Sequence, residues 1–267
     1  MSTKNKQTEL LQFDKYDRRV YEELYQFNTA KKLLSQNRHH IEHLGHVIVR
    51  HGLHDKFGVC LLHKHFDLFK DERLVRTIKA QAKTVFIGPS NRTKDVVPYL
   101  WKTELRSKKA WSLSPLEYVI KGEGRDSTNI DFHKYSEFLS EFSEHLSELR
   151  LNNIFGIATM NILSIPCKED ELRVETTDSD KRLLTVKIES RGSVELEELT
   201  ETFWTFLPND IIEINGVLKC KGAHCRFHCK SHCVAHCQSH CTKHPPPQLG
   251  NRDVLINPGL KTIKTKV

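Results

Sequence analysis

The sequence predicts an α+β fold, with a mostly antiparallel sheet, flanking helices and a small Cys/His-rich metal-binding segment at the C-terminal end. Two patterns predict the fold. Apolar residues recur at helical spacing early in the chain and again after its middle. Short apolar runs come late, and those at 171–176 and 183–189 enclose the turn sequence TDSDKR, which suits a hairpin. Helices and hairpins in separate runs are typical of the α+β class.

The apolar spacing predicts three helices. The first covers residues 14–36. The second covers residues 37–51 and ends at Gly52, because glycine adopts a left-handed conformation at little cost. The third is strongly amphipathic, and its apolar stripe consists of Phe132, Tyr135, Phe138, Leu139, Phe142, Leu146 and Leu149.

Strands are expected wherever a short apolar run is bounded by turn residues. These runs cover residues 57–68, 84–87, 154–160, 171–176, 183–189 and 203–207. Residues 90–130 are expected to be irregular, because Pro98, Pro115, Gly122 and Gly124 interrupt them. The strands therefore concentrate in the second half of the chain.

The length of 267 residues suits one large domain, or one domain with a small appendage. We divide the chain into a disordered polar tail (1–12), an α+β domain (13–217), a Cys/His module (218–247) and a C-terminal extension (248–267). The net charge of +7 is a mild excess with the two signs interleaved, so charge alone does not argue for nucleic-acid binding.

The chain shows neither a secretion signal nor a membrane segment. The opening MSTKNKQTEL lacks the apolar core of a signal peptide, and no stretch approaches the ~20 apolar residues of a membrane span. These absences predict a protein of the cytoplasm or nucleus that does not bind a membrane. In such a reducing compartment, clustered thiols act more often as metal ligands than as disulfides.

A Cys/His unit repeats every four residues between Cys220 and His244. It reads H-C-x-x, and no acidic residue lies between Lys219 and His244. Several pairs, such as Cys225 and His228, have the C-x2-H spacing of a short local chelate. The candidate metal ligands are Cys220, His224, Cys225, His228, Cys229, His232, Cys233, His236, Cys237, His240, Cys241 and His244.

Thiolate and imidazole suit zinc, with Cu(I) as the alternative, whereas calcium would need carboxylates that this segment lacks. The repeat has too few apolar residues to fold by burial, so we expect it to become ordered only when metal binds. Two alternatives stay open. The repeat is either a low-complexity tract that picks up metal incidentally, or a tail joined by disulfides under oxidising conditions.

A second histidine cluster lies between His39 and His65. On the strand predicted at 57–68, His63 and His65 point to one face, because side chains alternate, and Asp67 continues that face. An H-x-H pair of this kind is a candidate metal site or a catalytic acid–base pair. The other histidines, which the short loop after the second helix could bring close to this pair, are His39, His40, His43, His46, His51 and His54. Taken singly, the helix histidines among them are more typical of satisfied core or surface residues.

The segment RHGLHDKFGVCLLHKHFDL at 50–68 has an H-G turn, an F-G strand start and an H-x-H pair. It resembles a segment in a family of microbial and fungal proteins, some of which also end in a Cys/His-rich tail after an aromatic strand similar to Phe203–Phe206. The resemblance implies that residues 1–217 and the tail belong together. It implies no activity, because none is assigned to that family.

Three functions fit these patterns. We favour a metal-binding protein in which the C-terminal repeat holds zinc, or alternatively copper. The second hypothesis is a metal-dependent enzyme centred on His63 and His65, with the tail as a lid or clamp. The third is an interaction module whose zinc-ordered tail docks on nucleic acid or protein, for which the basic run 102–109 beside Trp101 and Trp111 gives weak support.

Overall fold

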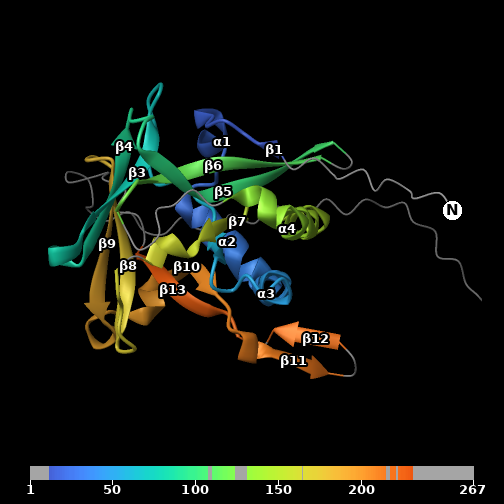
Figure 1. Cartoon of the computed structure of the whole chain (residues 1–267). Helices are drawn as coiled ribbons and strands as arrows, with labels where there is room; N and C mark the ends of the chain where they lie inside the picture. Colours follow the sequence, from blue (N-terminus) through green and yellow to red (C-terminus); the bar gives the residue numbers. More distant parts are fainter. Residues whose placement is uncertain are drawn as a thin grey trace, which may run out of the picture. The chain divides into compact units, whose positions relative to one another are not determined.

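The computed structural model of the chain describes residues 12–107, 110–123, 131–163, 165–214, 217–220 and 222–230. The described strands of the main sheet are β1 (Gln12–Phe13), β2 (Phe57–Leu61), β3 (Arg73–Lys79), β4 (Thr84–Ser90), β5 (Val96–Ser107), β6 (Ala110–Ile120), β7 (Phe155–Thr159), β8 (Glu171–Asp178), β9 (Leu183–Ser190), β10 (Leu199–Thr205) and β13 (His224–Lys230). A separate hairpin consists of β11 (Ile211–Ile214) and β12 (Val217–Cys220). Figure 1 shows both sheets.

The main sheet closes on itself. Its strand order is β1-β6-β3-β4-β9-β8-β13-β10-β2-β7-β5, and β5 also pairs with β6. Ten strands therefore form a closed barrel, to which β1 is attached through β6 (Figure 1). Most neighbours are antiparallel, but β3 pairs with β6 in parallel, and so does β13 with β8. Closure leaves the ten strands without an open edge.

The predicted α+β class, an antiparallel sheet with flanking helices, is wrong, because the strands form a closed mixed barrel. The largest error concerns residues 90–130, which contain β5 and β6, the longest strand pair of the barrel. The prolines there do not break the strands. The β5–β6 register shifts beside Pro98, and again beside Trp101, which pairs with Pro115, so the ladder passes residues that have no N–H to donate.

Four α-helices are described: α1 (Arg18–Glu22), α2 (Phe27–Asn37), α3 (His40–Arg50) and α4 (Ser136–Glu148). The helix predicted at 14–36 is two helices. The chain between them is extended at Gln26, which forms a bridge to Lys64. The other two predicted helices are confirmed, and Gly52 adopts the expected left-handed conformation, with φ of 68°. None of the described helices is both long and apolar enough to cross a membrane.

Short 3-10 helices connect several of these elements. They are η1 (Ala80–Ala82), η2 (Phe132–Tyr135), η3 (Met160–Leu163), η4 (Arg191–Ser193), η5 (Leu196–Glu198) and η6 (Pro208–Asp210). Residues 1–235 belong to one unit of the chain, and the second unit, 236–267, lies outside the described residues. Because β13 is part of the barrel, the barrel extends beyond residue 217, where we placed the domain boundary.

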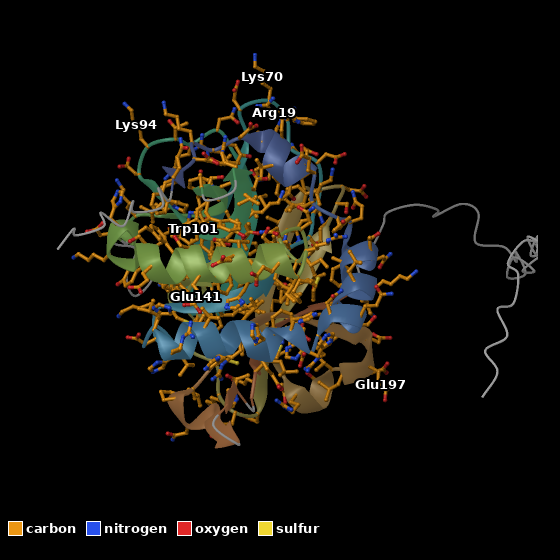
Figure 2. The ribbon with its side chains drawn as sticks, turned by 90° about the vertical axis from the view of Figure 1, so that its right-hand side faces the viewer. Arg19, Lys70, Lys94, Trp101, Glu141 and Glu197 are labelled. Atoms are coloured by element: carbon orange, nitrogen blue, oxygen red, sulfur yellow. The ribbon has the colours of Figure 1, made fainter. Side chains whose placement is uncertain are left out.

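Buried apolar side chains form two clusters, one on each face of the barrel wall. The outer core lies between the wall and the helices α3 and α4, and includes Phe142, Phe155 and Trp204. The inner core fills the barrel and includes Leu74 and Phe203. Figure 2 shows α4 and α3 next to each other, with Glu141 between them, where it pairs with groups on α3. The strands thus have buried side chains on both faces.

Candidate metal centre

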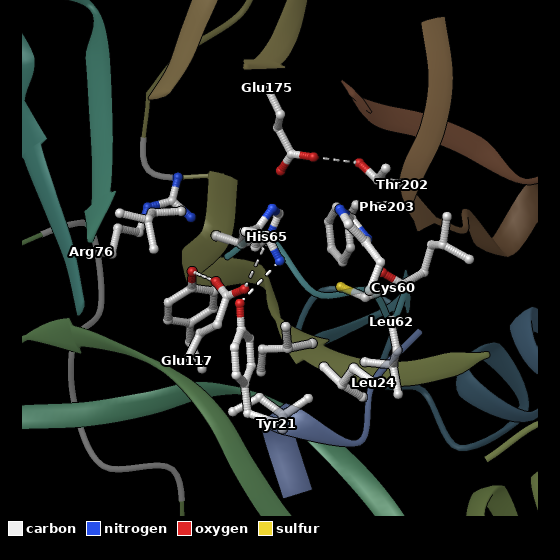
Figure 3. A pocket seen from close by; sticks show the side chains of 17 residues that line it. Tyr21, Leu24, Cys60, Leu62, His65, Arg76, Glu117, Glu175, Thr202 and Phe203 are labelled. Carbon is white, nitrogen blue, oxygen red and sulfur yellow. Dashed lines mark hydrogen bonds and ion pairs between the residues drawn. The ribbon is translucent and has the colours of Figure 1, made fainter. Parts of the chain in front are cut away.

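The interior of the barrel contains a cavity of about 30 Å³, which exceeds what one water molecule needs. Its wall is mixed. Apolar side chains of the inner core alternate with polar ones, and Figure 3 shows the polar groups converging on one space. The ionisable residues among them are Tyr21, Cys60, His63, His65, Arg76, Tyr99, Glu117 and Glu175. So many ionisable groups in an interior are costly to bury, which marks this space as a candidate site.

His63 and His65 lie together on this wall, as the H-x-H pattern predicts. Their ring centroids are 4.5 Å apart, and both side chains are buried. They follow β2, which ends at Leu61, earlier than the predicted strand end. The expectation that Asp67 continues their face is wrong, because Asp67 is exposed and forms an ion pair with Lys64.

The ring of His63 is oriented by the backbone. Its Nδ1 lies 3.1 Å from the carbonyl oxygen of Leu61. A carbonyl oxygen only accepts, so Nδ1 donates, and Nε2 is then the atom of the neutral ring that carries the lone pair. Histidines that bind metal commonly have their second nitrogen held in this way.

One group of described residues meets the geometry of a metal site: His63, Glu175 and Cys229. Their ligand atoms all lie within 4.8 Å of one another, and all three residues are buried. The topology explains the meeting, because Glu175 on β8 and Cys229 on β13 are direct partners in the parallel ladder. The hydroxyl of Thr202 donates to Glu175 at 2.9 Å and fixes the carboxylate.

Burial shapes the acid–base behaviour of this group. Desolvation raises the pKa of Glu175, and it raises the pKa of Cys229 well above that of an ordinary thiol. Both groups therefore hold a proton more readily than they would in water when no cation is near. A divalent ion would reverse this preference, because it stabilises carboxylate and thiolate together.

A second polar chain lies beside this group. His65 Nε2 is 3.7 Å from a carboxylate oxygen of Glu117, and Thr177 Oγ1 is 3.3 Å from His65 Nδ1. The hydroxyl of Tyr99 donates to the other oxygen of Glu117. His65 and Glu117 thus form a connected acid–base pair that lines the same cavity as His63 and Glu175.

The strand β13 contains the first two units of the Cys/His repeat. In a regular strand, a period of four would place every cysteine on one face and every histidine on the other. The β10–β13 ladder is irregular and leaves Thr202 and Arg226 without register partners. Cys229 is fully buried beside Glu175, while Cys225 packs against the outer core with its sulfur 3.6 Å from His228 Nε2. The C-x2-H spacing thus brings this pair together.

The other predicted ligands are placed as follows. Cys220 ends β12 and His224 begins β13. His232, Cys233, His236, Cys237, His240, Cys241 and His244 lie outside the described residues.

The helix histidines do not converge with His63 and His65, contrary to the expectation from the short loop. His43 Nε2 lies 3.3 Å from Nδ1 of His145, where α3 packs against α4, and His51 lies 2.9 Å from Glu141. Both contacts are on the outer side of the barrel wall. The loop does connect α3 to β2, but the wall separates these histidines from the cavity.

Sequence reasoning missed Glu175 as a partner of His63, because no local motif marks it. It sits in an ordinary strand, and only the pairing of β8 with β13 explains its position. Cys60 is buried and lines the same cavity as His63, because regular alternation stops where β2 ends. Comparisons with protein families, curated proteins and solved structures found no match, so none of them identifies the segment 50–68.

Proposed function

We propose that this chain is a metal-binding protein that holds a divalent ion inside the barrel through His63, Glu175 and Cys229. The observation that carries the proposal is the approach of three chemically different ligand atoms to within 4.8 Å in a buried site. Buried groups of this kind are costly unless they are paired or coordinate a metal. The Cys/His repeat extends the proposal, because Cys229 belongs to it and the repeat continues towards His244.

Zinc suits this ligand set better than copper. Zinc accepts imidazole, carboxylate and thiolate in one tetrahedral site, whereas Cu(I) prefers soft sulfur ligands. The barrel group contains one of each zinc-type donor. We therefore expect zinc in the barrel, and we keep copper as the alternative for the thiol-rich repeat.

A second candidate function is a metal-dependent enzyme centred on His63 and His65. One observation favours it: the barrel group has three protein ligands, and the connected pair His65 and Glu117 lines the same cavity. Catalytic zinc sites characteristically have three protein ligands and a fourth position for water or substrate. In this function, His63 holds the metal, and His65 exchanges protons with a molecule in the cavity.

Elemental analysis of the full-length chain tests the metal site. Because glutamate is absent from the repeat, Glu175→Gln removes a barrel ligand and leaves every repeat ligand intact. We expect this variant to bind one equivalent less zinc than the unmodified chain. His63→Ala should show the same loss, whereas His65→Asn should retain the metal.

Glu197→Gln is the matched control, because Glu197 is an exposed glutamate at the periphery of the molecule (Figure 2). It should bind as much zinc as the unmodified chain. Equal zinc contents in Glu175→Gln, His63→Ala and this control would refute a barrel site, and would leave the repeat as the candidate for metal binding.

A further inference from the structure

Arg76 is the most unusual charged residue of the barrel. It lies on β3, and only 2% of its surface is exposed. Its guanidinium group faces the rings of Tyr99 and Phe227, with centroid distances of 5.5 and 6.0 Å. In Figure 3 the side chain of Arg76 points into the cavity that Glu117 and Glu175 also face.

Within the described part of the chain, no hydrogen bond or ion pair within 4.0 Å engages this guanidinium, and its Nε is buried without an acceptor. Contacts with ring faces do not satisfy its N–H donors. Burying an arginine without acceptors is strongly unfavourable, and native interiors almost always provide them. The side chain is therefore set up for an acceptor that comes from outside the chain.

An oxyanion is the acceptor that fits a guanidinium best. The planar fork of arginine matches two oxygens of a carboxylate or phosphoryl group, which distinguishes it from a point charge such as lysine. The cavity of about 30 Å³ can take more than one water-sized group.

The metal ion decides when such an anion can bind. Arg76 shares the cavity wall with the carboxyl groups of Glu117 and Glu175, which do not attract an anion. A divalent ion held by His63, Glu175 and Cys229 adds positive charge to this space and attracts an oxygen ligand directly. Anion binding should thus require the metal.

A surface hollow shares one wall residue with the cavity. His65 lines the interior cavity, and it also lines a surface hollow of about 510 Å³. The hollow is bordered by Lys64, Asp67, Arg182 and the first residues of α2. Lys64 pairs with Asp67, and Arg182 pairs with Glu72, so these charges are balanced locally and the hollow leaves room for a ligand to approach.

We propose that the cavity binds a small oxyanion, the carboxylate or phosphoryl group of a ligand, between Arg76 and the metal ion. The proposal rests on the metal site proposed above, and it names the class of ligand for that site. In the enzyme reading, the same oxyanion belongs to the substrate, and His65 and Glu117 lie beside it.

Thermal unfolding of the full-length zinc-loaded chain, with inorganic phosphate or with acetate added, tests this proposal. We expect one of the two anions to raise the midpoint, and the one that does identifies the group as phosphoryl or carboxylate. Titration calorimetry with that anion should give an affinity at least about tenfold weaker for Arg76→Met, since hydrogen bonds to charged groups are lost. Arg76→Lys keeps the positive charge but lacks the planar fork. Its affinity for the anion should therefore lie between those of the unmodified chain and Arg76→Met.

A readout on the unmodified chain covers the case in which these variants do not fold. Removing zinc with a chelator should abolish the anion effect. An anion effect that survives zinc removal, no effect of either anion, or equal affinities in folded Arg76 variants would overturn the proposal. The zinc content of each sample, measured in parallel, separates this result from failure of the metal site itself.

Discussion

The outer and inner cores of this barrel differ in chemistry although they share one wall. The outer core, under α3 and α4, is built from large apolar side chains such as Phe138, Phe142 and Trp204. The inner core includes apolar residues too, but it surrounds Arg76 and Glu175. Apolar burial stabilises a fold, whereas buried charges rarely do so compared with apolar residues of similar size. We infer that the outer core contributes apolar burial alone, whereas the inner core combines apolar burial with the ionisable groups of the proposed site.

The largest effect should come from the outer core. Phe142 on α4 is fully buried, so Phe142→Ala should lower the free energy of unfolding by about 3–5 kcal/mol, through lost burial and the cavity left behind. Urea denaturation at constant zinc would measure it. Leu196→Ala is the control, because Leu196 is 49% exposed and its loss should have little effect. Similar losses in both variants would contradict the assigned role of the outer core.

Metal should stabilise the inner core by mass action. If the barrel binds zinc, chelation should lower the free energy of unfolding by about 2.7 kcal/mol, relative to a solution with free zinc at about 100 times Kd. Denaturation of the full-length chain with and without chelator measures this difference. In Glu175→Gln this difference should be mostly absent, because the variant lacks a barrel ligand while its repeat is intact. A chelation effect of the same size in both proteins would place the stabilising metal outside the barrel.

A tight contact in the outer core gives a third comparison. A Cβ added at Gly45 on α3 would lie 2.1 Å from the ring of Phe206, so Gly45→Ala should destabilise the fold by about 1–3 kcal/mol through overpacking. Gly192→Ala is the matched control, because its added Cβ meets no atom within 4 Å. Thermal denaturation would separate the two. A Gly45→Ala variant as stable as the control would show that the ring of Phe206 moves aside at little cost.

The smallest effect concerns the histidines between α3 and α4. Burial is the largest cause that lowers the pKa of His43, His46 and His51, and nearby Arg50 or His145 lowers it further. The unfolded chain therefore binds more protons as the pH falls below about 6.5, and stability decreases in that direction. Urea denaturation at pH about 7.5 and about 5.5 should show the decrease. The fall in the free energy of unfolding should be smaller in His43→Gln than in the unmodified chain. An equal fall in the two proteins would contradict the role assigned to His43.

Local patterns predicted local elements well. The amphipathic stripe around Phe142 corresponds to α4, the stop at Gly52 is where α3 ends, and the hairpin at 171–189 corresponds to β8 and β9. Each of these depends on neighbours a few residues apart. The prediction failed at β5 and β6, where Pro98 and Pro115 suggested loops, because register shifts in a long hairpin accommodate proline and cannot be recognised from composition.

The site was predictable only in part. The H-x-H spacing identified His63 and His65 as a pair, and the repeat identified Cys229 as a candidate ligand. Neither pattern indicated that His63 and Cys229 belong to the same ligand group. Glu175 and Arg76 had no signal at all, since single charged residues in strands are ordinary on the surface of a protein.

By itself, the sequence determined which residue types are available and where short-range periodicity places them: helices with apolar stripes, a hairpin, and cysteines and histidines at chelating spacing. Only the tertiary structure decided which of these meet. Closure of the barrel places β13 between β10 and β8, and this pairing puts Cys229 beside Glu175 and across from His63. The physical reason is that strand order and register depend on contacts far apart in the chain, which local spacing does not encode.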